Sequence, residues 1–431
     1  MSSVAIGFSG LGILFALIAF GMPIGFAMGL VGFAGFAFLV SFDAAVVRIG
    51  VTSYSIVTNY AIGTVPLFLF MANLLFESGI GRDLYEFAAR WFGRRRGGLA
   101  MATIGASSGF AAVSASSLAT TATMGLVALP EMLKHRYKTT LASGSVVAGG
   151  TIGSLIPPSG MFIIYGILTE TSIGKLFAAG IVPGILLALF YLIAIAVWCR
   201  IDPEAGPRGQ KYSLREKLLG FAKTGEVIAL FVLIMGGIML GYFTPTEAGA
   251  IGAFGAILIS AARKRLTSDA VKRAIYATVR STGMIFGILF GAFVFNSFVT
   301  ASTIPLHIVD FVTESGLAPL SVLLLVLGVY FILGMVLDAS AMMTLTIPLF
   351  FPLMTTLGFD AVLFGVLVVR MTEIALITPP VGMNVYVLSG IAKDIPLDRI
   401  FRGALPFVAA DILHVAMLIA FPILVLWLPG L

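Results

Sequence analysis

The sequence predicts an all-α polytopic membrane protein, and three observations lead to this fold class. Of its 431 residues, 59% are hydrophobic and only 11% are charged, whereas a soluble domain is about 25% charged. Long stretches carry no charge, and about 20 apolar residues are what a helix needs to cross a bilayer. The single Cys199 and three scattered histidines form no disulfide framework or metal-site pattern. We therefore expect a protein embedded in the lipid bilayer and without an organic or metal cofactor.

Ten apolar segments are each long enough for one crossing. They are Ala5–Phe20, Ile24–Ser41, Ser55–Phe76, Leu141–Leu168, Leu176–Cys199, Thr224–Gly241, Ala248–Ala262, Thr282–Val299, Ala361–Ile391 and Ala404–Leu428. Two further segments, 99–129 and 320–354, are too long for one crossing and are broken by Gly, Ser or Asp near their middle. We predict that each of these two folds as a re-entrant hairpin.

Basic residues support this layout. Twenty-three of the 26 lysines and arginines fall in five clusters, near residues 82–96, 134–138, 200–223, 263–280 and 393–402. All five clusters lie on one side of the membrane if both hairpins return to the side from which they came, as the positive-inside rule requires. Both termini then lie outside. The formal net charge of +6 thus reflects orientation in the membrane, and we expect no nucleic-acid partner.

The chain contains an internal repeat. Pro157-Pro158 and Gly160-Met161 recur as Pro379-Pro380 and Gly382-Met383, each following one of the broken segments. In the predicted layout the two copies cross the membrane in opposite directions, an arrangement typical of secondary transporters with a site near the midplane. The predicted division is N-terminal scaffold helices at 1–54, a first inverted repeat at 55–199, a cytoplasmic linker with connecting scaffold helices at 200–281, and a second inverted repeat at 282–431.

Each Pro-Pro pair must interrupt its helix, because proline lacks a backbone N–H and disfavours helical geometry at the preceding residue. The free N–H groups and the positive end of the following half-helix can hold an anionic substrate group, while the freed carbonyls can coordinate a cation. This reasoning nominates Pro157, Pro158 and Ser159, together with Pro379 and Pro380, for substrate binding. The alternative is that Pro-Pro only kinks a packed helix.

The two hairpin tips carry polar residues. The first tip is rich in Ser and Thr between Ser114 and Thr121, and hydroxyl oxygens suit Na⁺, although small residues also line ordinary helix contacts. The second tip carries Asp338, placed 14 residues before Pro352 just as Ser116 stands 14 before Pro130. An intramembrane carboxylate is costly, so we expect Asp338 to form a cation or substrate site, with a hydrogen bond to a helix end as the alternative.

Four other charged residues lie within apolar segments. Arg370 and Glu373 stand i,i+3 on the helix leading to Pro379, so a mutual salt bridge is predicted, with binding of a substrate carboxylate by Arg370 as the alternative. Glu247 and Asp411 have no counterpart in the repeat, and for them we expect contacts to a neighbouring helix or subunit.

These residues resemble a known family, the large membrane subunit of tripartite ATP-independent periplasmic (TRAP) transporters. The resemblance covers essentially the whole chain and rests on Pro157-Pro158-Ser159, Tyr165-Gly166, Ser172-Ile173-Gly174, Leu176-Phe177, Gly180 to Gly184, Gly334 to Asp338 and Thr378-Pro379-Pro380-Val381-Gly382. It implies an elevator-type, Na⁺-driven transporter of organic acids in the bacterial inner membrane, with both termini periplasmic. It also implies two partners, a small four-helix membrane subunit and a periplasmic substrate-binding protein.

By analogy with the family, one cation site would combine Ser114, Ser116 and Ser117 with the break at Gly153 and Ile156. A second would combine Asp338 with Thr378 and Gly382. The resemblance leaves the substrate open among C4-dicarboxylates, sialic acid, other sugar acids and 2-oxo acids. No phosphate-binding Gly-x-x-x-x-Gly-Lys-Ser/Thr loop occurs in the chain, so no nucleotide is expected to drive transport.

Two other functions compete with this interpretation. One is a stand-alone Na⁺- or H⁺-coupled carboxylate or anion transporter of related architecture that needs no binding protein. The other is a membrane-embedded enzyme, which the scattered histidines and single cysteine disfavour.

Overall fold

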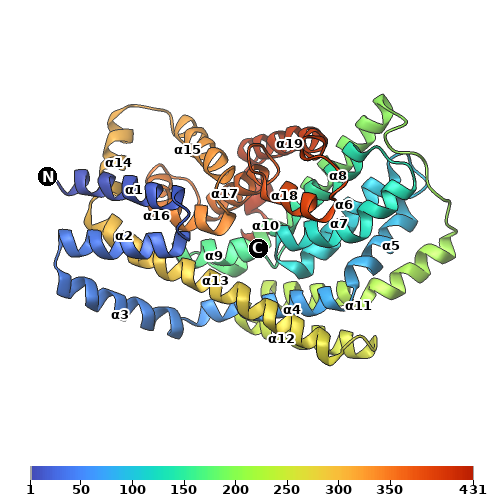
Figure 1. Cartoon of the computed structure of the whole chain (residues 1–431), viewed down its shortest axis with the longest axis horizontal. Helices are drawn as coiled ribbons and strands as arrows, with labels where there is room; N and C mark the ends of the chain where they lie inside the picture. Colours follow the sequence, from blue (N-terminus) through green and yellow to red (C-terminus); the bar gives the residue numbers. More distant parts are fainter. Residues whose placement is uncertain (1, 431) are drawn as a thin grey trace.

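The computed structural model describes residues 2–430, and helices are the regular elements in this part of the chain. Figure 1 shows an elongated molecule with the first three helices at one end and helix α13 extending from them along one long side. Six helical segments are long and apolar enough to cross a membrane: Tyr60–Glu77, Ile173–Ile201, Pro245–Ala262, Ser268–Ala301, Ala339–Thr356 and Leu397–Ala420. These segments agree with the predicted polytopic helical class, while the expected ten crossings stay a prediction.

One group of helices is built on the packed pair α4 and α13. It comprises α1 (Ser3–Ala19), α2 (Ile24–Leu39), α3 (Phe42–Thr58), the 3₁₀ turn η1 (Tyr60–Gly63), α4 (Thr64–Glu77), α11 (Leu214–Met239), α12 (Pro245–Ala262) and α13 (Ser268–Ala301). Helix α13 packs against α2 and α4, and α4 also packs against α12. The α2–α13 contact needs glycine, because a Cβ on Gly32 would lie 2.6 Å from the backbone of Phe295. Close approach through small residues is how apolar helices associate in a bilayer.

The remaining helices form two series with the same order: a single helix, a helix pair, an interrupted helix and a long helix. The first series is α5 (Ile80–Phe92), α6 (Gly98–Ser114), α7 (Ser117–Lys134), α8 (Thr139–Thr151), the 3₁₀ turn η2 (Ile152–Ser154), α9 (Gly160–Thr169) and α10 (Ile173–Ile201). The second is α14 (Ile304–Glu314), α15 (Pro319–Gly334), α16 (Ala339–Thr356), α17 (Ala361–Ala375), α18 (Met383–Ile391) and α19 (Leu397–Ala420), followed by α20 (Ile423–Leu426) and η3 (Leu428–Gly430). Both predicted interruptions at Pro-Pro are confirmed.

The two series interlock near the middle of the molecule. Helix α18 packs against α7, α9 against α16, α8 against α19 and α10 against α17, and these helices meet in the centre of Figure 1. Backbones touch where α8 crosses α19, because a Cβ on Gly144 would collide with the carbonyl group of Gly403. Elements far apart in sequence are thereby fixed against each other around the two interruptions.

Several helix boundaries differ from the sequence-based expectation. The segment Ser55–Phe76 is not one helix, because α3 ends at Thr58 and the side chain of Asn59 accepts a hydrogen bond from the Ala61 amide at the start of η1. Helices α3, α5 and α14 were not expected. Polar residues dilute their apolar pattern, as at Arg48 of α3, whose Nε donates to the Ser297 hydroxyl at 2.7 Å. Both predicted hairpin segments consist of two helices, but the side to which they return stays a prediction.

Candidate functional site

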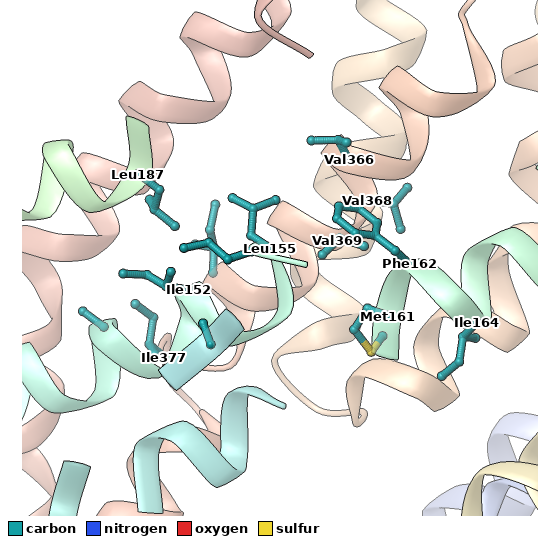
Figure 2. Packing of buried hydrophobic residues seen from close by; sticks show 14 of the residues in the cluster. Ile152, Leu155, Met161, Phe162, Ile164, Leu187, Val366, Val368, Val369 and Ile377 are labelled. Carbon is teal, nitrogen blue, oxygen red and sulfur yellow. The ribbon is translucent and has the colours of Figure 1, made fainter. Parts of the chain in front are cut away.

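The first interruption is a short, buried and tightly hydrogen-bonded segment. After η2 the chain passes through Pro157-Pro158, and α9 restarts at Gly160. Ser159 caps this restart: its hydroxyl accepts from the Phe162 amide at 3.3 Å and donates to the Ser154 carbonyl. Figure 2 shows how apolar side chains surround this turn, with Ile152 and Leu155 on one side and Phe162 beside valines of α17 on the other. The buried position of the Pro-Pro pair means that this interruption has no direct access to solvent.

The tip between α6 and α7 is held by its own hydroxyl groups. Ala115 has a φ of 52°, which lets the chain reverse, and Ser116 caps α7 by accepting from the Ala119 amide. The Ser114 and Thr120 hydroxyls lie 2.8 Å apart, and Thr120 donates to the Ser116 carbonyl at 2.8 Å. Three hard oxygen atoms are thereby placed next to one another.

This tip lies directly against the first interruption. The Gly160 amide donates to the Ala115 carbonyl at 3.3 Å. A Cβ on Gly153 would stand 2.8 Å from both the Ser116 carbonyl oxygen and the Thr120 hydroxyl, so only glycine permits the approach. The structure therefore brings Ser114, Ser116 and Gly153 together.

The side chains of the other two residues of the first predicted cation site make other contacts, and their part in that site stays a prediction. The side chain of Ile156 lies against α10, where a Cβ on Gly184 would be 2.6 Å from it. The hydroxyl of Ser117 instead accepts a hydrogen bond from the side-chain amide of Asn384 at 2.9 Å.

The second interruption is more open than the first. Pro379 and Pro380 are exposed, whereas Pro157 and Pro158 are buried. The Thr378 hydroxyl donates to the Ile374 carbonyl at 2.7 Å. Gly382 stands at the start of α18 with a φ of 60°, and no side chain caps this helix. Both Pro-Pro peptide bonds are cis.

Asp338 caps α16 at the second tip. Its Oδ1 accepts from the Ser340 amide at 3.0 Å and from the Ala341 amide at 3.1 Å, and the residue is half-buried. The hydrogen bonds that the structure records for Asp338 therefore match the structural alternative. The tip approaches the second interruption at Gly334, where a Cβ would lie 2.7 Å from that of Ala375. The grouping of Asp338 with Thr378 and Gly382 as a cation site stays a prediction.

Arg370 is fully buried, and its ion pair differs from the predicted one. Its Nη2 lies 2.5 Å from Oδ1 of Asp411 on α19, and neither carboxylate oxygen of Glu373 has a hydrogen-bond partner among the described residues. The predicted Arg370–Glu373 salt bridge is thus wrong, because the long arginine side chain reaches across to the neighbouring helix. The expectation that Asp411 contacts a neighbouring helix is confirmed, whereas Glu247 caps its own helix α12 by accepting from Thr244.

Tyr191 extends this buried ion pair. Its hydroxyl donates to Asp411 Oδ1 at 2.6 Å and lies 2.8 Å from the Thr151 hydroxyl. A polar chain thereby runs from the end of α8 through α10 and α19 to α17. Arg370 takes part in this network, and its proposed contact with substrate stays a prediction.

Two polar residues were missed as site residues by sequence reasoning. Asn384 and Glu373 are both fully buried, and both lie close to the first tip although they belong to the second series. Asn384 was detectable as the one amide in the apolar segment 383–391, immediately after the Gly-Met pair. Glu373 was noticed only as a partner for Arg370.

A cavity with mixed charge opens away from the tips, between α5, α7 and the chain after α10. Its volume is about 640 Å³, and its charged lining residues are Arg82, Glu86, Arg90, Glu131, Lys134 and His135. In the predicted orientation this cavity lies on the cytoplasmic side.

Comparison with known proteins agrees with this architecture. The chain resembles a C4-dicarboxylate TRAP transporter large permease protein of Pseudomonas aeruginosa, with 37% identity over 86% of this chain and 85% of that protein. It is also 31% identical to a sialic acid TRAP transporter large permease protein of Vibrio cholerae, over 98% of this chain and 97% of that one. The solved YdaH transporter of Alcanivorax borkumensis shares the fold, with a TM-score of 0.68 and 14% identity over 90% of this chain and 91% of that structure.

A family model decides the assignment. The description "Tripartite ATP-independent periplasmic transporter, DctM component" matches residues 11–424, which is nearly the whole chain. The relatives are named as transporter permease subunits, a family that is not enzymatic. The resemblance noted in the sequence is thereby confirmed: this chain belongs to the DctM family of TRAP transporter large permease subunits.

Proposed function

We propose that this subunit is a Na⁺-coupled secondary transporter that imports an organic acid delivered by a periplasmic substrate-binding protein. One structural observation carries the proposal beyond family membership. The tip between α6 and α7 contacts the start of both half-helices, through Ala115 to α9 and through Ser117 to α18. A cation bound at this tip would therefore stand next to both candidate anion-binding helix ends.

The second interruption is the better candidate for the substrate carboxylate. Helix α18 has no side-chain cap, and in its first turn the Asn384 amide donates to the Leu376 carbonyl and the Val385 amide to the Gly382 carbonyl, so the Met383 amide is the one without a recorded partner among the described residues. The positive end of a helix favours an anionic group, and the exposure of Pro379 and Pro380 gives access. Pro157 and Pro158 are buried by contrast, so a substrate has no such access to the first interruption.

The relatives support the substrate class. The Pseudomonas protein is named for C4-dicarboxylates and the Vibrio protein for sialic acid, and both names denote carboxylic acids. We therefore propose an organic acid with at least one carboxylate, released toward the cytoplasm through the cavity beside α5 and α7.

A Na⁺ gradient suffices energetically. Each net positive charge that moves inward gains about 2.3 kcal/mol per 100 mV, and a tenfold accumulation requires about 1.4 kcal/mol. Two Na⁺ carried with a monoanion therefore support more than tenfold accumulation without a nucleotide. Movement of the hairpins and interrupted helices against the helices around α13, as in an elevator, would expose the site alternately to each side.

We further propose assembly in the bacterial inner membrane with both termini periplasmic. A small membrane subunit would bind the apolar surface of the N-terminal helices, which expose large side chains including Phe20, Phe26, Phe38 and Phe42. The periplasmic binding protein would deliver the substrate from the other side of the bilayer.

The test is reconstitution of this chain with its small subunit and binding protein in liposomes under an inward Na⁺ gradient. Labelled succinate and sialic acid are offered separately, each with its cognate binding protein. The proposal expects uptake of one acid that needs both Na⁺ and the binding protein. Equal uptake in choline buffer would refute Na⁺ coupling, and equal uptake without the binding protein would instead support the stand-alone transporter.

A further inference from the structure

Glu373 is a buried carboxylate to which the structure gives no hydrogen-bond partner. Its side chain is 0% exposed, and both Oε1 and Oε2 lack a partner among the described residues. It sits on α17, two residues before that helix ends at the second interruption. A buried ionised carboxylate is very costly unless a positive charge compensates it, so something must neutralise this group.

The surrounding charges do not neutralise Glu373. Arg370 is the nearby cation, but it is already paired with Asp411. His414 on α19 lies near Arg370, and neither of its ring nitrogens is in hydrogen-bond geometry with a partner among the described residues. With a neutral imidazole, one arginine stands against two carboxylates, and the buried cluster carries one excess negative charge.

Oxygen atoms converge on Glu373 from the other series of helices. The hydroxyl groups of Ser117 at the start of α7 and Ser154 in η2 lie near its carboxylate, although neither is in hydrogen-bond geometry with it. The Asn384 Nδ2 donates to the Ser117 hydroxyl at 2.9 Å, and the Asn384 Oδ1 lies 3.4 Å from the same hydroxyl, so its amide oxygen lies in the same group. The first tip, the first interruption and the second series therefore all contribute oxygen atoms to one enclosed place.

We propose that Glu373, Ser117, Ser154 and Asn384 form a site for a monovalent cation, specifically Na⁺, in which Glu373 supplies the charge. Carboxylate, hydroxyl and amide oxygens are hard ligands that suit such an ion. One positive charge cancels the excess of the cluster, whereas a divalent ion would reverse it. The inference rests on the proposed Na⁺ coupling and names a charged ligand that joins the two series.

The site also explains how an ion would act on the substrate position. Glu373 lies six residues before Pro379 of the exposed Pro379-Pro380 pair, and Asn384 lies in the first turn of α18. Binding of the cation would pull both flanks of the second interruption toward Ser117 of the first tip.

The test measures Na⁺ binding through stability, independently of transport. The purified complex of the large subunit with its small subunit is heated in detergent over a series of NaCl concentrations, with choline chloride keeping ionic strength constant. Wild type is expected to gain thermal stability saturably with Na⁺, as any ligand of the folded state requires. Glu373→Gln should weaken the apparent Na⁺ affinity by about tenfold or more. Even the loss of a residue that only hydrogen-bonds to a metal ligand lowers metal affinity by about 10–100-fold.

Two further variants separate binding from a merely structural role. In Na⁺-free buffer Glu373→Gln should be at least as stable as wild type, because it removes an uncompensated charge; lower stability at every Na⁺ concentration would overturn the proposal. Ser154→Ala should weaken Na⁺ binding severalfold and leaves the carboxylate in place. Glu247→Gln, an exposed carboxylate that caps α12, is the matched control and should titrate like wild type.

The outcomes also separate this inference from the proposed function. If wild-type uptake requires Na⁺ but Glu373→Gln shows the same Na⁺ titration as wild type, only the Glu373 site is wrong. If wild-type uptake proceeds without Na⁺, the proposed coupling is wrong whatever the stability titration shows. A wild-type protein stabilised by lowered pH and not by Na⁺ would assign a proton to Glu373 and overturn the cation site.

Discussion

The Arg370–Asp411 pair offers the sharpest test of the buried network. Arg370→Met and Asp411→Leu each break an ion pair in which both side chains are 0% exposed. Removal of one partner from a buried pair typically costs about 3–5 kcal/mol, because the other charge is left uncompensated. The two single variants should differ, however, because Glu373 lies nearby. Arg370→Met leaves two carboxylates together, whereas Asp411→Leu leaves Arg370 opposite Glu373.

We therefore expect Arg370→Met to lie near the upper end of that range and Asp411→Leu near the lower end. Unfolding entropy of about 2.1 cal/mol/K per residue makes 1 kcal/mol correspond to about 1 °C for a chain of this length. The expected losses in melting temperature are thus about 5 °C and about 3 °C, measured by thermal unfolding of the purified complex. The double variant leaves Glu373 as the one charge of the cluster, so its net charge is the same as in wild type. Replacement of a buried ion pair by apolar residues often leaves stability unchanged.

The double variant is accordingly expected to be more stable than either single variant. If the two losses simply add, the pair does not interact and the reasoning is refuted. If Asp411→Leu lowers the melting temperature more than Arg370→Met, then Glu373 does not compensate the charge of Arg370. The assigned charges of the buried cluster would then be wrong.

Three further predictions concern the tips and the crossing helices. Asp338→Asn keeps an N-cap residue and should fold like wild type, yet it should lose Na⁺-dependent uptake in the liposome assay. Normal uptake by this variant would show that Asp338 only caps helix α16. Ser159→Ala removes the cap of α9 and should lower the free energy of unfolding by about 0.5–2 kcal/mol, which is measured as a lower melting temperature. Ser159→Thr keeps a hydroxyl and should retain most of the wild-type stability. Gly144→Ala places a Cβ against the Gly403 carbonyl and should cost about 1–3 kcal/mol or more; a wild-type melting temperature would show that α8 and α19 do not touch.

Much of the architecture was readable from the sequence because the bilayer imposes simple rules. The lengths of the apolar segments identified most helices. The two Pro-Pro pairs located both interruptions, because proline has no backbone N–H to continue the hydrogen bonds of a helix. The hydroxyl-rich stretch between Ser114 and Thr121 was predicted as a hairpin tip, but only the family resemblance placed it beside the first interruption, where the Gly160 amide donates to the Ala115 carbonyl. Helices α3 and α5 were missed because charged residues along them obscure an apolar run.

The pairing of charges was harder to predict than the helices. The i,i+3 spacing along α17 predicted that Arg370 pairs with Glu373. The arginine instead pairs with Asp411, which lies 41 residues later in the chain, on α19. Likewise nothing local indicates that Asn384 meets Ser117, a contact that spans 267 residues. Such contacts depend on how the two series of helices pack against each other, and the spacing of residues along the sequence does not determine that packing.

The contact of the α6–α7 tip with both interruptions has a thermodynamic consequence. A ligand that binds only when this tip is in place lowers the free energy needed to order the start of α9 and of α18 together. A second ligand that requires the same arrangement then binds more tightly, and linkage makes the enhancement equal in both directions. Cooperativity between ion and substrate would thus follow from one shared turn of backbone, without any contact between the two ligands.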